Sequence, residues 1–115
     1  MKKYEVNHQL LVTARDNYEG KIFILSTHPI KIILPTTSWE GDPQALFHKH
    51  INLDSIWALY RIIDCITNID TQRIILQYGC SIPLDTILRD AYWVEFKLED
   101  HKSTNELLNG IRVTL

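Results

Sequence analysis

Glycine, proline and cysteine are scarce in this chain of 115 residues, which contains four glycines, four prolines and two cysteines. So few glycines leave no glycine-rich loop of the kind that cradles phosphate groups. Cys65 and Cys80 form no C-x-x-C pair and lie among apolar residues, so we expect buried thiols in a reducing compartment. No apolar run has the length of a membrane span or follows the basic start as in a signal peptide. The sequence therefore predicts a cytoplasmic protein.

An excess of basic charge is also absent, because the formal net charge is −2 and the sequence pI is about 6.2. This balance argues against nucleic-acid binding, which usually requires a basic domain. Residues 1–49 carry six Lys/Arg and five Asp/Glu, whereas residues 50–115 carry six Lys/Arg and nine Asp/Glu. The acidic second part suits a basic protein partner better than a phosphate backbone.

The length suits one domain, residues 1–115, that is large enough to build its own hydrophobic core. The first part favours β-structure. Apolar and polar side chains alternate over residues 4–15, which is typical of a half-buried strand. Turn residues 16–20 separate this strand from β-forming residues 21–26, and residues 30–34 form a third candidate strand with a proline on either side. We therefore predict an antiparallel meander.

The middle of the chain favours helices. After a loop that contains Trp39, Asp42 and Pro43 are suitable as N-cap and first residue of a short helix over residues 43–50. Asn52 can cap a long helix over residues 52–68, in which apolar side chains recur at helical spacing. Residues 70–79 then predict another helical turn or two, ending at a glycine.

Residues 80–90 fit two structures. As a helix they place Asp85 and Arg89 at i, i+4, and as a strand they form a hairpin with residues 92–98. We favour the helix, because a turn without glycine or asparagine is a poor hairpin turn. The strand at 92–98 alternates, with one face expected in the core and the other exposed. The core face holds Tyr92, Val94, Phe96 and Leu98, and the exposed face holds Trp93, Glu95 and Lys97.

A capping box at Ser103 and Glu106 predicts a short helix that ends at Gly110, and residues 111–115 predict a closing strand. The predicted fold class is α+β: an N-terminal antiparallel β-meander packed against one long helix and several short ones, with C-terminal strands completing the sheet.

One segment suggests metal chemistry. Asp85 or Asp90 precedes the pair Glu95 and Lys97, and carboxylates can hold Mg²⁺ while a lysine steadies a phosphate. Over about 16 residues this segment loosely resembles metal-dependent nucleases of the PD-(D/E)xK type. The resemblance implies a Mg²⁺-dependent nuclease with Asp85, Glu95 and Lys97 as its catalytic residues. It requires residues 82–88 to be a strand, and the proline is not adjacent to the aspartate.

Other catalytic constellations are absent from the sequence. His8, His28 and His101 are isolated, and His48 and His50 are two residues apart instead of four, so we expect no metal ligands and no cofactor. His8 lies on the apolar face of the first strand, where a hydrogen-bonded core histidine is the common outcome. The chain also lacks a nucleophile elbow or a catalytic cysteine signature.

The three tryptophans all stand near acidic residues, which is typical of protein interfaces. On the predicted long helix, Trp57 shares a polar stripe with acidic and basic side chains. The predicted partner-binding residues are Trp39, Asp54, Trp57, Arg61, Asp64, Trp93 and Glu95.

These features together predict a small protein-binding module without enzymatic activity. Its most specific form is an immunity or antitoxin-type inhibitor that neutralises a basic toxin such as a nuclease, since an acidic binder is complementary to a cationic substrate groove. The alternatives are the Mg²⁺-dependent nuclease and an accessory subunit of a larger assembly. We expect no contact with nucleic acid or membrane. A monomer and a homodimer both fit the sequence.

Overall fold

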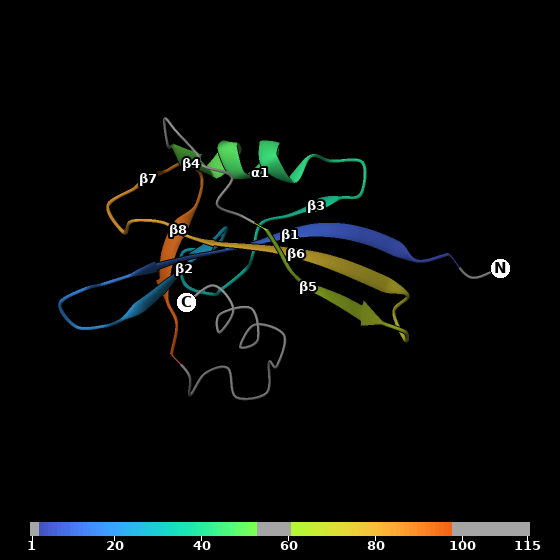
Figure 1. Cartoon of the computed structure of the whole chain (residues 1–115), viewed down its shortest axis with the longest axis horizontal. Helices are drawn as coiled ribbons and strands as arrows, with labels where there is room; N and C mark the ends of the chain where they lie inside the picture. The colour runs from blue at the N-terminus through green and yellow to red at the C-terminus, as the bar shows by residue number, and fades with distance from the viewer. Residues whose placement is uncertain (1–2, 53–60, 98–115) are drawn as a thin grey trace.

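The computed structural model describes residues 3–52 and 61–97, with side chains from Cys65 onward in the second range. This part is mostly β-structure, with a mixed sheet and one short helix above it (Figure 1). The elements are β1 (Glu5–Arg15), β2 (Ile22–Ser26), β3 (Thr36–Ser38), α1 (Pro43–His50), β4 (Ile51–Asn52), β5 (Arg61–Asn68), β6 (Arg73–Ser81), β7 (Ile87–Leu88) and β8 (Tyr92–Glu95). In the described ranges, no helix is long and apolar enough to cross a membrane.

The main sheet has six strands, of which five lie in the order β5-β6-β1-β2-β8. Strand β1 pairs in parallel with β6 from Glu5 to Thr13. Along its other side, β1 pairs antiparallel with β3 near its start and with β2 near its end. The predicted antiparallel pairing of the first two strands is therefore confirmed. The sheet as a whole is mixed, because β6 from the second half of the chain pairs in parallel with β1.

Strand β1 is buried on both faces, not on one. Five consecutive residues, Leu10 to Ala14, are each at most 1 % exposed. Because neighbouring side chains point to opposite faces of a sheet, β1 contributes to two cores. The helix-side core consists of Leu10, Val12, Leu25, Phe47, Ile51, Cys80 and Ile82. The opposite core consists of Leu11 and Ile24, with Ile32, Leu34 and Phe96 packed against them.

The predictions from local sequence are confirmed at the β1–β2 turn and at the start of α1. The Asp16 carboxylate accepts a hydrogen bond from the Tyr18 N–H at 3.0 Å, and Gly20 has a φ of 71°, which glycine adopts without strain. At α1, the Asp42 Oδ1 accepts from the Gln44 N–H at 2.9 Å and Pro43 begins the helix. Both elements were predictable because their hydrogen bonds join residues close in sequence.

The predicted third strand at 30–34 is absent, and this segment is a loop between β2 and β3. The buried Ser26 organises it: its hydroxyl donates to the Lys31 carbonyl at 2.6 Å and accepts from the N–H groups of His28 and Ile33. The His28 ring accepts two further backbone N–H groups at its Nδ1. Side chains therefore satisfy the backbone groups that a strand would have paired with another strand.

The predicted long helix at 52–68 is wrong wherever the structure describes it. Asn52 lies in β4 and accepts from the Arg89 guanidinium at 2.7 Å, while residues 61–68 form β5. Residues 70–79 are also strand, not helix, from Arg73 onward. Isoleucine-rich segments of this length suit either structure, and the antiparallel pairing of β5 with β6 decides for the sheet.

Residues 80–90 form neither the favoured helix nor a hairpin strand next to 92–98. Strand β6 ends at Ser81, Leu84 and Asp85 lie in a turn, and the two-residue strand β7 pairs with β4. Strand β8 is confirmed over Tyr92–Glu95 and pairs with β2. The helix and strand expected within 103–115 lie outside the described residues.

Candidate functional site

The candidate site is the turn between β3 and α1, residues 38–41, which we call the Trp39 turn. The Gly41 N–H donates to the Ser38 carbonyl at 2.9 Å, which closes a four-residue β-turn. Trp39 and Glu40 occupy the two central positions of this turn. Strand β3 attaches it to the sheet, because Ser38 pairs with Asn7 and Thr37 pairs with His8.

Gly41 keeps this turn close to the preceding strand. A Cβ atom at this position would collide with the hydroxyl of Thr37. The turn therefore requires glycine for the close approach of its backbone to the Thr37 side chain, not for a positive φ.

Trp39 is 60 % exposed, yet the structure fixes both its backbone and its ring. Its ring stacks on the ring of His8, with 5.2 Å between centroids and 21° between planes. The Trp39 carbonyl lies 3.1 Å from the Nε2 of His8. Since a carbonyl only accepts hydrogen bonds, the His8 Nε2 carries the proton in this contact.

His8 is itself buried and held. It is 6 % exposed, and its Nδ1 lies 3.0 Å from the hydroxyl of Tyr78 on β6. In the neutral histidine, Tyr78 donates to this nitrogen. The expectation of a hydrogen-bonded core histidine is thereby confirmed. Residues from β1, the turn and β6 thus form one cluster that presents Trp39 to solvent.

The charge around Trp39 is negative. Glu40 and Asp42 are both exposed, and the sequence has no Lys or Arg between Ile32 and His48. Within the described residues, the ion pairs join Lys21 to Glu19 and Arg73 to Glu5, so neither involves these two carboxylates. One oxygen of Asp42 caps α1, and Glu40 takes part in no ion pair among the described residues.

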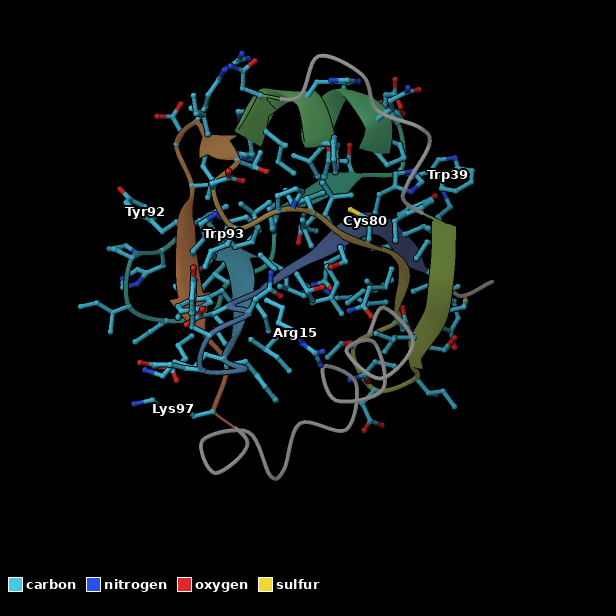
Figure 2. All side chains as sticks on the ribbon, turned by 60° about the vertical axis from the view of Figure 1, so that its left-hand side comes forward. Arg15, Trp39, Cys80, Tyr92, Trp93 and Lys97 are labelled. Carbon is cyan, nitrogen blue, oxygen red and sulfur yellow. The ribbon has the colours of Figure 1, made fainter. Side chains whose placement is uncertain are left out.

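Trp93 does not belong to an exposed face, and that part of the prediction is wrong. It packs against the helix-side core, and its indole N–H is buried without an acceptor among the described residues. Tyr92 is the exposed neighbour, at 47 %. Figure 2 shows the two side chains on opposite sides of β8, with Trp93 toward the interior. Both faces of this segment therefore contribute to a core: Trp93 packs on the helix side, and Phe96, from the predicted core face, packs against the opposite core.

The other predicted partner residues do not join the Trp39 turn as a described group. Glu95 is half-buried at the end of β8, across from Phe23 on β2. Asp54 and Trp57 lie outside the described residues. Arg61 and Asp64 lie in β5, although their side chains are not described, and the helical stripe that grouped them does not exist there.

The strand arrangement that the nuclease pattern requires is also absent from the described residues. Asp85 lies in a turn, and it lines a shallow groove with Arg15, Asp16, Asn17, Tyr18, Pro83 and Leu84. Asp90 follows β7 with a φ of 48°. Because β7 pairs with β4, it does not provide a strand beside β8. In the described part of the chain, no three His, Cys, Asp or Glu side chains could hold a metal ion together.

The two cysteines, which lie outside the Trp39 turn, differ in burial. Cys80 is buried in the helix-side core, and burial raises the pKa of its thiol to about 12. Cys65 is exposed, so the expectation that both thiols are buried is wrong.

Hydrogen bonding and charge from Glu19, with a smaller contribution from Glu95, raise the pKa of the exposed Lys21 ammonium.

Comparison with known proteins identifies a fold and no family. No family model and no curated protein matches the chain. Among solved structures, the chain is similar to the NUDIX domain of Shewanella oneidensis NrtR, which was crystallised with ADP ribose. The two are 11 % identical with a TM-score of 0.53, over 98 % of this chain and 85 % of that domain. The protein therefore has a NUDIX-like fold of mixed α/β type.

Proposed function

We propose that the chain is a protein-binding module and that the Trp39 turn is its contact surface. The observation that carries this proposal is a largely exposed tryptophan whose ring and carbonyl are both held by a buried histidine. Tryptophan is among the residues most enriched in binding hot spots. Because Trp39 is already oriented, little side-chain entropy is lost when a partner covers it.

The charge of the turn favours a basic partner. Glu40 and Asp42 follow the tryptophan closely and are in no ion pair among the described residues, and complementary charge speeds association and selects the partner. We infer the most specific form of this function from the same charge: an immunity-type inhibitor that neutralises a basic toxin and has no catalytic chemistry of its own. A cytoplasmic location fits this role and stays a prediction.

Trp39→Ala tests the proposal. We expect this variant to lose the protein that the wild-type chain captures from its source cell, and photo-crosslinking from position 40 to mark the same protein. The matched control is Tyr18→Ala, because Tyr18 is 99 % exposed at the β1–β2 turn and its ring serves no contact in the Trp39 cluster. Circular dichroism checks that both variants fold. Capture that is equal for wild type and Trp39→Ala would exclude the Trp39 turn as the binding surface.

A second candidate is a nucleotide-like ligand, because the similar NUDIX domain was crystallised with ADP ribose. The observation that favours it is a second groove at the β5–β6 hairpin, where two isoleucines adjoin amide, hydroxyl and guanidinium groups. The lining residues are Ile66, Asn68, Thr71, Arg73 and Ile75. Calorimetric titration with ADP ribose tests this candidate, and we expect Arg73→Ala to abolish the heat of binding. An absence of heat with the wild-type protein would exclude it.

A further inference from the structure

We propose that the open face of the Trp39 indole receives an arginine side chain of the partner, with Glu40 as the counter-ion. This inference rests on the proposed protein-binding function and specifies what the Trp39 turn recognises. The ligand of this surface is then a guanidinium group, and a lysine or a neutral side chain should bind there more weakly.

The geometry leaves one face of the indole for a ligand. His8 stacks against the other face at 5.2 Å, and 60 % of the residue is exposed. A planar group that lies on the open face would extend the stack of two rings to three layers. Tryptophan is the aromatic side chain that attracts cations most strongly over its ring face.

The negative charge of Glu40 favours a cation, and the planar shape of the guanidinium group favours arginine over lysine. Glu40 is the neighbour of Trp39 in the turn and lies in neither ion pair of the described residues. A guanidinium can stack on the indole and still offer two parallel N–H groups to a carboxylate at its edge. An ammonium is a strongly hydrated point charge and cannot satisfy both contacts in this way.

An anionic ligand suits the turn poorly. The N-terminus of α1 follows directly, but the Asp42 carboxylate already accepts the Gln44 N–H there. Between Ile32 and His48 the sequence contains no Lys or Arg that could pair with an anion. The turn therefore presents an aromatic face and carboxylates, which together fit a cation.

The test uses small probes on the full chain. N-acetyl-arginine amide, N-acetyl-lysine amide and N-acetyl-citrulline amide are titrated while the indole N–H signals are followed by NMR. The Trp39 signal is identified by its absence in Trp39→Phe. We expect saturable shifts of this signal with the arginine compound at millimolar concentration, weaker binding of the lysine compound, and no saturable shift with the uncharged citrulline compound.

Glu40→Gln should weaken binding of the arginine compound roughly 1.5- to fivefold, which is the range for an exposed ion pair. The control is Glu19→Gln, which removes an exposed carboxylate that is paired with Lys21 in the β1–β2 turn, and it should leave the affinity unchanged. Equal shifts with arginine and citrulline, no shift with either, or an unchanged affinity in Glu40→Gln would each overturn the inference.

The two proposals fail in different ways. If Trp39→Ala loses the captured protein but the arginine compound does not bind, the arginine inference fails and the binding module stands. If Trp39→Ala still captures the protein, the Trp39 turn is not the contact surface. In that case, binding of the arginine compound to the wild type would show only that the turn can hold a guanidinium group. The inference that the partner inserts an arginine there would fail.

Discussion

At the scale of single residues, hydrogen bonds between close neighbours were visible in the sequence, and those between distant residues were not. Asp42 could be recognised as an N-cap because its acceptor oxygen serves Gln44, two residues on. His8 could be placed in the core by alternation, but its partners Trp39 and Tyr78 are 31 and 70 residues away. No local pattern encodes such a pairing, so the support beneath Trp39 was missed.

Ser26 provides a test at this scale. Its side chain is fully buried and serves three backbone groups of the loop that follows β2. Ser26→Ala leaves these part-buried groups without their partner. A fully buried unsatisfied group costs about 1–3 kcal/mol, and a part-buried one costs less because water can reach it. We expect the free energy of unfolding to fall by about 2–4 kcal/mol, measured by urea denaturation.

Thr27→Ala is the matched control, because it removes the adjacent hydroxyl. Thr27 is exposed and its Oγ1 makes one hydrogen bond, of 3.3 Å, to the Ile33 carbonyl. We expect a loss of at most about 1 kcal/mol, since the carbonyl can turn to water. A similar loss in both variants would show that the Ser26 hydroxyl does not organise the loop.

At the scale of elements, short segments with strong local signals were predicted and the isoleucine-rich ones were not. Helix α1 has its cap and its proline at the expected positions. Strands β5 and β6 instead carry runs of isoleucine whose spacing also fits a helical face. Their structure is decided by pairing, from Arg61 opposite Gly79 to Asn68 opposite Arg73, with a bulge between Ile62 and Asp64. Such pairing gains its stability from non-local contacts, which a single sequence does not display.

Substitution of Gly41 tests whether the Trp39 turn depends on the close approach of Gly41 to Thr37. In Gly41→Ala the new methyl group collides with the Thr37 hydroxyl. Overpacking of this kind costs about 1–3 kcal/mol, and we expect a loss of stability in that range by urea denaturation. Displacement of the turn should also shift the NMR signal of the Trp39 indole.

Thr37→Ala combined with Gly41→Ala removes the hydroxyl that causes the collision. Because the two positions are in direct contact, their effects should not add, and the double variant should recover part of the stability lost in Gly41→Ala. Additive losses would mean that the close approach of Gly41 to Thr37 does not hold the turn.

At the scale of the whole molecule, the decisive feature is a central strand that is buried on both faces. Alternation over residues 4–15 suggested one buried face, because Thr13 and Gln9 are polar. Thr13 is nevertheless fully buried, and its Oγ1 lies 3.5 Å from the Cys80 carbonyl on the parallel strand β6. A combination of strands and helix could be predicted, but the described residues are mostly β-structure with one short helix and a mixed sheet, not the predicted α+β arrangement around a long helix. The parallel pairing of β1 with β6 joins residues almost 70 positions apart and had no local signal.

The rates at which the two cysteines react with a thiol reagent measure how readily the fold opens, because Cys65 is exposed and Cys80 is 4 % exposed in the helix-side core. With a thiol reagent at neutral pH, we expect one equivalent to react fast and the second only at the rate of unfolding. Urea should accelerate the second reaction, and Cys80→Ala should eliminate it while the fast reaction remains. Two equally fast reactions in the folded wild-type protein would contradict the placement of Cys80.

The same thiol makes stability depend on pH in the alkaline range. Burial raises the pKa of Cys80 from 9.0 to about 12, so the folded state keeps the thiol neutral while the unfolded state ionises above 9.0. Its contribution to stability is therefore complete below pH 9 and is lost as the pH rises toward 12. We expect the stability advantage of the wild type over Cys80→Ala, measured by urea denaturation, to shrink between pH 8 and pH 11. The comparison cancels the titration of lysines and tyrosines, which both proteins share. An advantage that stays constant over this range would mean that the Cys80 side chain has access to water in the folded protein.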